Sequence, residues 1–145
     1  MLEINNFTNS QVDQDLLEKI AQRVLKEEKK EGLVSLVFIG PRRMRKLNFK
    51  YRKKNRITDV LSFSYSKEKD FVFPPGGKKQ LGEIFICLRE VKKRAKREQL
   101  DFQKELARTF VHGLLHLLGY DHKKQKEKEI MLQKENKYLD YFFKS

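Results

Sequence analysis

Cysteine and long apolar runs are scarce in this chain, and each scarcity excludes a class of protein. Cys87 is the one cysteine among 145 residues, so an intramolecular disulfide framework is excluded and a reducing cytosol is the expected environment. No stretch approaches the roughly 18 consecutive apolar residues that a membrane-spanning helix needs. The first residues have neither the basic start nor the apolar segment of a secretory signal. We therefore expect a soluble, cytoplasmic protein that has no membrane partner.

Acidic residues are also in short supply relative to basic ones. The chain has 33 lysines and arginines against 20 aspartates and glutamates, which gives a formal net charge of +13. A field of this sign attracts polyanions, and nucleic acid is the commonest polyanion that a soluble protein meets. The alternative is that a lysine-rich surface merely reflects the composition of the source proteome.

The apolar residues that are present occur in periodic clusters. They make up 39% of the chain, which indicates a folded globule despite a mean hydropathy of −0.73. The length suits a single domain over residues 1–145. Helical spacing predicts helices over 11–30, 41–52, 89–97, 101–118 and 127–142. Short β-branched or alternating segments predict strands over 2–7, 33–39, 60–65 and 81–88.

These elements predict an α+β fold, with a single small mixed sheet of about four strands packed with about five helices. Asn9 or Ser10 is the expected cap of the first helix, and Pro41 suits the first position of the second. The prolines and glycines at 73–77 predict a loop. The apolar residues around Cys87 predict that it is a small core residue rather than a nucleophile.

The strongest chemical signal is a cluster of histidines. The chain has three, His112, His116 and His122, and all lie within one short segment. Residues four apart on a helix share a face, so His112 and His116 can bind one tetrahedral ion. Gly119 can adopt a positive φ and turn the chain so that His122 returns to the same ion. Three protein ligands and one open position are typical of a catalytic zinc site, here at a helix end.

Zinc peptidases share this histidine spacing but differ at one position. They carry a glutamate directly after the first histidine, and that glutamate is the general base for the zinc-bound water. Gly113 stands at this position here and cannot accept a proton. The sequence therefore retains the zincin-like metal site but lacks the peptidase base, so peptide hydrolysis is disfavoured.

Several segments together resemble the YbeY family of bacterial metallo-endoribonucleases. They are the histidine motif with Gly113, the sequence TDVLSF at 58–63 and the sequence LGEI at 81–84. Upstream, the pairs Leu47-Asn48 and Tyr51-Arg52 also fit the family. The chain departs from the family at Glu83, where an aspartate is more frequent.

The resemblance implies a function and a set of site residues. It implies an α+β rRNA maturation endoribonuclease that cleaves single-stranded RNA, matures the 3′ end of 16S rRNA and takes part in ribosome quality control. Its partners would be ribosomal RNA, the small ribosomal subunit and ribosomal proteins. His112, His116 and His122 match the family's metal ligands, and Arg52 matches its functionally important arginine.

Other residues are candidates on chemical grounds. Arg52 offers a planar fork for the charge that develops on phosphorus, although it can also be a plain surface arginine. Asp121 could orient His122 or accept a proton, or it could only form a turn, and Asp59 could support a metal ligand. The candidate RNA-binding residues are Arg52, Lys53, Lys54 and Arg56.

Two aromatic residues and two further functions complete the predictions. Phe49 and Tyr51 could stack on bases, but a place in the core is the favoured prediction for both. The main alternative to a zinc-dependent endoribonuclease is a non-catalytic ribosome-assembly factor whose metal holds the helix end in place. A metallopeptidase ranks third because Gly113 removes its base.

Overall fold

A mixed four-stranded sheet forms the centre of the protein. The computed structural model describes residues 1–65 and 79–143. In these ranges the strands follow the order β1-β2-β4-β3. They are β1 (Leu2–Asn6), β2 (Leu33–Ile39), β3 (Val60–Ser64) and β4 (Gln80–Cys87). β1, β2 and β4 run parallel to one another, whereas β3 pairs antiparallel to β4 and forms the edge opposite β1.

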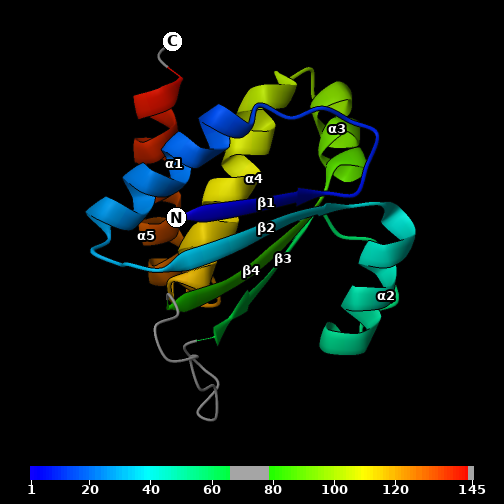
Figure 1. Cartoon of the computed structure of the whole chain (residues 1–145), viewed down its shortest axis with the longest axis horizontal. Coiled ribbons are helices and arrows are strands. Elements are labelled where there is room, and N and C mark those ends of the chain that lie inside the picture. Colours follow the sequence, from blue (N-terminus) through cyan, green and yellow to red (C-terminus); the bar gives the residue numbers. More distant parts are fainter. Residues whose placement is uncertain (66–78, 144–145) are drawn as a thin grey trace.

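Helices cover the two faces of the sheet unequally. They are α1 (Gln14–Glu27), α2 (Pro41–Arg52), α3 (Leu88–Arg97), α4 (Phe102–Leu117) and α5 (Gln125–Phe142). Figure 1 shows α1, α4 and α5 together on one side of the sheet and α2 on the other. The predicted α+β fold with a small mixed sheet is confirmed. None of the helices in the described part of the chain has the length and apolarity needed to cross a membrane.

The first helix is shorter than its pattern predicted. Its cap is Asp13, whose carboxylate accepts the Leu16 N–H, and not Asn9 or Ser10. Ser10 instead lies in the preceding loop, where its hydroxyl accepts a hydrogen bond from Lys92. The helix ends at Glu27, before the left-handed residue Lys29. Pro41 does begin α2, as predicted, whereas the loop expected at 73–77 lies outside the described residues.

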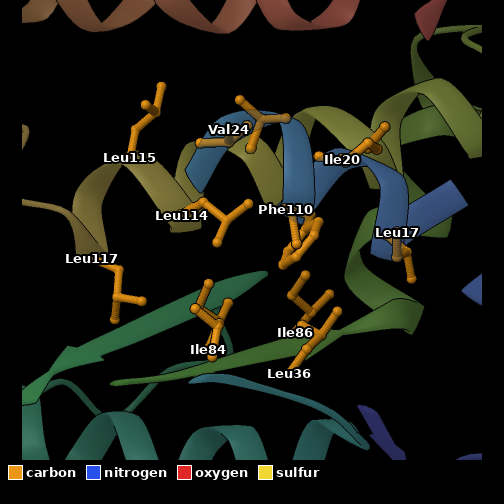
Figure 2. Packing of buried hydrophobic residues seen from close by; sticks show 14 of the residues in the cluster. Leu17, Ile20, Val24, Leu36, Ile84, Ile86, Phe110, Leu114, Leu115 and Leu117 are labelled. Carbon is orange, nitrogen blue, oxygen red and sulfur yellow. The ribbon is translucent and has the colours of Figure 1, made fainter. Parts of the chain in front are cut away.

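The main core lies between the sheet and the helices α1 and α4. Figure 2 shows Ile84 and Ile86 of the sheet facing Phe110 and Leu114 of α4, and all four are fully buried. Burial of each such side chain contributes about 1.5–3 kcal/mol, so α4 is held firmly against the strands. Cys87 is buried on the opposite side, among residues that α2 covers, and its predicted place in the core is confirmed.

Candidate metal centre

The histidines meet where α4 ends. His112 and His116 lie on α4, and His122 lies in the loop before α5. Their ring centroids are 6.4 Å apart for His112 and His116, 5.6 Å for His112 and His122, and 5.5 Å for His116 and His122. The structure therefore brings together the three residues that the sequence singled out, and their role as metal ligands stays a prediction.

Gly119 makes the return of His122 possible. Its φ of 107° lies in a region that residues with a Cβ rarely adopt. Around it, the N–H of Tyr120 donates to the Leu115 carbonyl at 3.0 Å and the N–H of Gly119 to the His116 carbonyl at 3.2 Å. These two bonds form a Schellman motif, which satisfies carbonyls left free at a helix end. The turn directs the chain back toward the open end of α4.

Hydrogen bonds determine which nitrogen each α4 histidine presents. Nδ1 of His116 lies 2.8 Å from the carbonyl of Tyr120, and Nδ1 of His112 contacts the carboxylate of Glu135. A carbonyl or carboxylate oxygen can only accept, so each Nδ1 carries the hydrogen. The lone pair of each Nε2 is then free for a cation, which is the usual arrangement of metal-binding histidines.

Asp121 adds a carboxylate to the histidines. Candidate ligand atoms of His116, Asp121 and His122 all lie within 4.8 Å of one another. The Asp121 carboxylate accepts the backbone N–H of His122 at 2.7 Å. That hydrogen bond, helped by the charge of Lys123 and opposed by slight burial, holds the pKa of Asp121 below its ordinary value. Imidazole nitrogens together with an ionised carboxylate suit a zinc ion, so the residues present fit the predicted metal.

A cleft of about 720 Å³ opens over these residues. One side, here called the histidine wall, consists of His112, His116, Asp121 and His122. The opposite side, here called the basic wall, consists of Tyr51, Arg52, Lys54 and Arg56. Strand β3 forms the floor between them with residues 60–64. Of the predicted RNA-binding residues, Lys53 does not line the cleft.

Arg52 is connected to the histidine wall through the floor. One of its terminal nitrogens donates to the Ser62 carbonyl at 3.0 Å, and the Ser62 hydroxyl donates to the Gly113 carbonyl at 3.0 Å. A Cβ built on Gly113 would lie 3.0 Å from Ile84 and 3.3 Å from Ser62. Gly113 therefore lets α4 approach the sheet closely, and the position of the peptidase base faces β3.

Asp59, which the sequence offers as a possible support for a metal ligand, is paired with Arg94. Its carboxylate accepts from Arg94 of α3 at 2.7 Å, although it also lines the cleft. Arg94 extends from there to Glu105 at 3.3 Å and Thr109 at 2.9 Å, both on α4. Burial alone would lower the pKa of Arg94, but Asp59 and Glu105 raise it. This network joins the start of β3 to α4.

Sequence reasoning missed Glu135, the carboxylate that contacts His112. It lies on α5, is 6% exposed, and is separated from His112 by 23 positions. Its only local signal is a charged residue in an amphipathic helix, which is ordinarily a solvent-facing position. The contact depends on how α5 packs against α4, and this packing cannot be predicted from the spacing of residues in the sequence.

The prediction that Phe49 and Tyr51 lie in the core is wrong. They are 58% and 53% exposed, because α2 buries only the stripe that contains Met44 and Asn48. The Tyr51 ring packs edge-on against Phe63, with centroids 5.1 Å apart, and lines the cleft. An exposed aromatic ring is thus part of the basic wall.

The fold and the cleft define a class of small α+β protein in which a histidine cluster, of the kind that binds metal ions, faces a basic surface. A family model described as Endoribonuclease YbeY matches residues 3–142, and the chain belongs to the YbeY family. The family resemblance in the sequence is confirmed.

Relatives match over most of their length. A protein named Endoribonuclease YbeY from Carboxydothermus hydrogenoformans is 39% identical over 143 residues, which cover 96% of this chain and 95% of the relative. One of the same name from Buchnera aphidicola subsp. Schizaphis graminum is 35% identical over 137 residues, with coverages of 90% and 84%. The solution structure of TM1509 from Thermotoga maritima matches with a TM-score of 0.64, 28% identity and coverages of 97% and 87%.

Proposed function

We propose that this protein is a zinc-dependent endoribonuclease that cleaves single-stranded RNA. The observation that carries the proposal is that three histidines and Asp121 line one side of a cleft whose other side carries Arg52, Lys54 and Arg56. Curated relatives bear the name Endoribonuclease YbeY, which supports the reaction class. In the cell we place the protein in the cytoplasm, in maturation of the 3′ end of 16S rRNA, with the small ribosomal subunit and ribosomal proteins as partners.

The two walls have different proposed tasks: the histidine wall binds the metal ion, and the basic wall binds the RNA. His112, His116, His122 and Asp121 would hold the ion, which supplies Lewis acidity toward a phosphoryl oxygen and toward water. Arg52 is exposed and uses one of its five N–H groups on the Ser62 carbonyl, so the others can bind a phosphate. Asp121 receives the His122 N–H on Oδ1, which leaves Oδ2 to ligate the ion or to take a proton.

The basic wall also favours single strands over duplexes. Lys54 and Arg56 can follow a phosphate backbone, and Tyr51 offers a ring on which an unpaired base can stack. In a duplex the base faces are already stacked on one another, so Tyr51 has nothing to bind. This combination of cations and an exposed aromatic ring is common in proteins that bind single-stranded RNA.

Peptide hydrolysis fits the site less well than RNA cleavage. The position that carries the peptidase base is Gly113, which packs against Ile84 and Ser62. A carboxylate there would have to displace the floor of the cleft. The site therefore lacks the glutamate of the zinc peptidases at this position and also the space for one.

A cleavage assay with measured zinc content tests the proposal. Wild type, His116→Ala and Arg52→Ala are each given single-stranded and duplex RNA. We expect wild type to contain zinc and to cut only the single strand, His116→Ala to lose cleavage, and Arg52→Ala to cut far more slowly than wild type. If zinc is bound but all three proteins leave RNA intact, the non-catalytic assembly factor is the correct function. Equal degradation by all three would mean a contaminating nuclease.

A further inference from the structure

The carboxylate of Glu28 is a meeting point for residues far from it in the sequence. Glu28 caps the end of α1, and its side chain is 8% exposed. Oε1 accepts the Tyr120 hydroxyl at 2.5 Å. Oε2 accepts the Tyr138 hydroxyl at 2.5 Å and the Lys134 ammonium at 2.8 Å. A buried carboxylate with three donors is fully paired, and it links α1, α5 and the loop between α4 and α5.

The charges in this cluster reinforce one another. Burial alone would raise the pKa of Glu28, but the donors Lys134, Tyr120 and Tyr138 lower it below its ordinary value. Burial and the Glu28 charge both raise the pKa of Tyr138, so that hydroxyl stays protonated and keeps donating. The cluster is therefore a persistent ion-paired group at neutral pH rather than a switch.

Tyr120 connects the Glu28 cluster to the candidate metal centre. Its hydroxyl is held by Glu28, its N–H closes the end of α4, and its carbonyl accepts from Nδ1 of His116 at 2.8 Å. The ammonium of Lys134 lies 5.1 Å from the centroid of the Tyr120 ring. The residue is thus fixed at three polar atoms and along its ring, and a displacement of the ring would move the carbonyl that orients His116.

Helix α5 supports both of the α4 histidines. Lys134 holds Glu28, which reaches His116 through Tyr120, while the adjacent Glu135 contacts His112 directly. Figure 1 shows α1 and α5 side by side on the same face of the sheet as α4, which lets α1 and α5 reach the residues at the end of α4. Two independent supports from one helix turn indicate that the histidines are held in place before any ion binds.

We propose that Glu28 and Tyr120 are positioning residues of the metal centre, in which Glu28 fixes the Tyr120 hydroxyl so that the Tyr120 carbonyl holds His116 with Nε2 toward the ion. This role rests on the proposed metal centre, although it needs no assumption about the substrate. Groups that orient a metal ligand from behind typically change metal affinity by about 10–100-fold when removed.

The two tyrosines provide a matched test. Tyr120→Phe and Tyr138→Phe each remove one hydroxyl from the same carboxylate, but only Tyr120 carries the carbonyl that holds His116. Zinc affinity is measured by competition with a chromogenic chelator, and the stability of the metal-free proteins by thermal unfolding. We expect Tyr120→Phe to weaken zinc binding by about tenfold or more. We expect Tyr138→Phe to lower the unfolding midpoint and to leave zinc affinity near the wild-type value, because Lys134 still holds Oε2 of Glu28 and Tyr120 still donates to Oε1.

Glu28→Gln and its neighbour Glu27→Gln extend the test. Glu27 pairs at the surface with Arg23 and Lys137, so Glu27→Gln should bind zinc as wild type does. Glu28→Gln should weaken zinc binding, and adding Tyr120→Phe should weaken it little further, because both changes interrupt one path. These results would show that zinc affinity depends on the hydrogen bonds from Glu28 through Tyr120 to His116, and not on the overall charge of α1.

The outcomes separate this inference from the proposed function. Wild-type zinc affinity in Tyr120→Phe, or an equal loss in Tyr120→Phe and Tyr138→Phe, would overturn the positioning role. A wild-type protein that binds no zinc would overturn the metal centre and the positioning role together. If wild type binds zinc but does not cut RNA, the nuclease function fails, and the affinity comparison still decides the role of Glu28 and Tyr120.

Discussion

The two walls of the cleft differ in how firmly they are held. On the histidine wall, α4 is packed against the sheet, and both of its histidines have a hydrogen-bond partner behind them. On the basic wall, residues 51–57 are exposed, and Arg52 is held by a bond to the Ser62 carbonyl. A metal site needs ligands fixed in advance, whereas a flexible polyanion is better met by side chains that can adjust. The difference therefore matches the two tasks that we propose.

The largest expected effect is on the histidine wall. His116→Ala removes a ligand, so zinc content should fall from about one ion per chain to a small fraction and cleavage should fall below detection. Metal analysis of the purified protein and an RNA assay measure the two effects. The circular dichroism spectrum should stay that of wild type. Full zinc content in this variant would mean that His116 is not a ligand.

The next effect is on the basic wall, where position matters more than charge. Arg52→Ala should reduce the cleavage rate by about 10²–10³-fold, as loss of a group that stabilises transition-state charge does. Lys53→Ala removes the same charge from the adjacent position, outside the cleft, and should cost little. Zinc content should be normal in both. A comparable loss in both variants would reduce the role of Arg52 to general electrostatic attraction.

Arg94 joins the start of β3 to α4, and its loss should lower the stability of the fold. Arg94→Leu leaves Asp59 without its cation and Glu105, whose side chain is 8% exposed, without its closest one. The free energy of unfolding should fall by about 1–3 kcal/mol, measured with urea. The control is Arg97→Leu, which breaks an exposed pair with Glu98 and should change stability by under about 0.5 kcal/mol. Equal effects would show that the network adds nothing.

A smaller effect is expected from Tyr51. Tyr51→Leu should weaken binding of single-stranded RNA by about tenfold, the value of one stacked base, and leave duplex binding unchanged. Phe49→Leu is the matched control, since Phe49 is similarly exposed on α2 but does not line the cleft. Binding is measured with a His116→Ala background so that RNA stays intact. The same loss from Phe49→Leu would assign the effect to the surface of α2 as a whole.

The smallest effect is a change in acid stability. The folded-state pKa of Glu28 lies below its ordinary value of 4.5, so its charge stabilises the fold above that pH. The contribution is lost as the pH falls from 4.5 through the lowered folded-state pKa. Metal-free wild type should therefore lose stability more steeply than Glu28→Gln as the pH falls below 4.5. Parallel curves from urea unfolding at each pH would mean that Glu28 is not the group responsible.

Local patterns were sufficient for most elements and for the histidine cluster. The strand over 33–39 and the helix over 41–52 have the predicted bounds, because their apolar periods and the Gly40-Pro41 break are signals within a few residues. The prediction that Phe49 and Tyr51 lie in the core is wrong, because the sequence does not show how wide a face of α2 the sheet covers. Asp59 has its partner on α3, which no local pattern indicates.

The sequence by itself determined that His112 and His116 share a helix face, that Gly119 turns the chain, and that the surface is basic. These follow from the helical period, the freedom of a residue without a Cβ, and composition. Only the tertiary structure decided what stands behind the histidines. Glu135 lies 23 positions from His112, and Glu28 lies 92 positions from Tyr120, so their contacts exist only because α1 and α5 pack beside α4. Hydrophobic burial sets that packing for the whole layer, and it leaves no mark at the individual polar residues that it brings together.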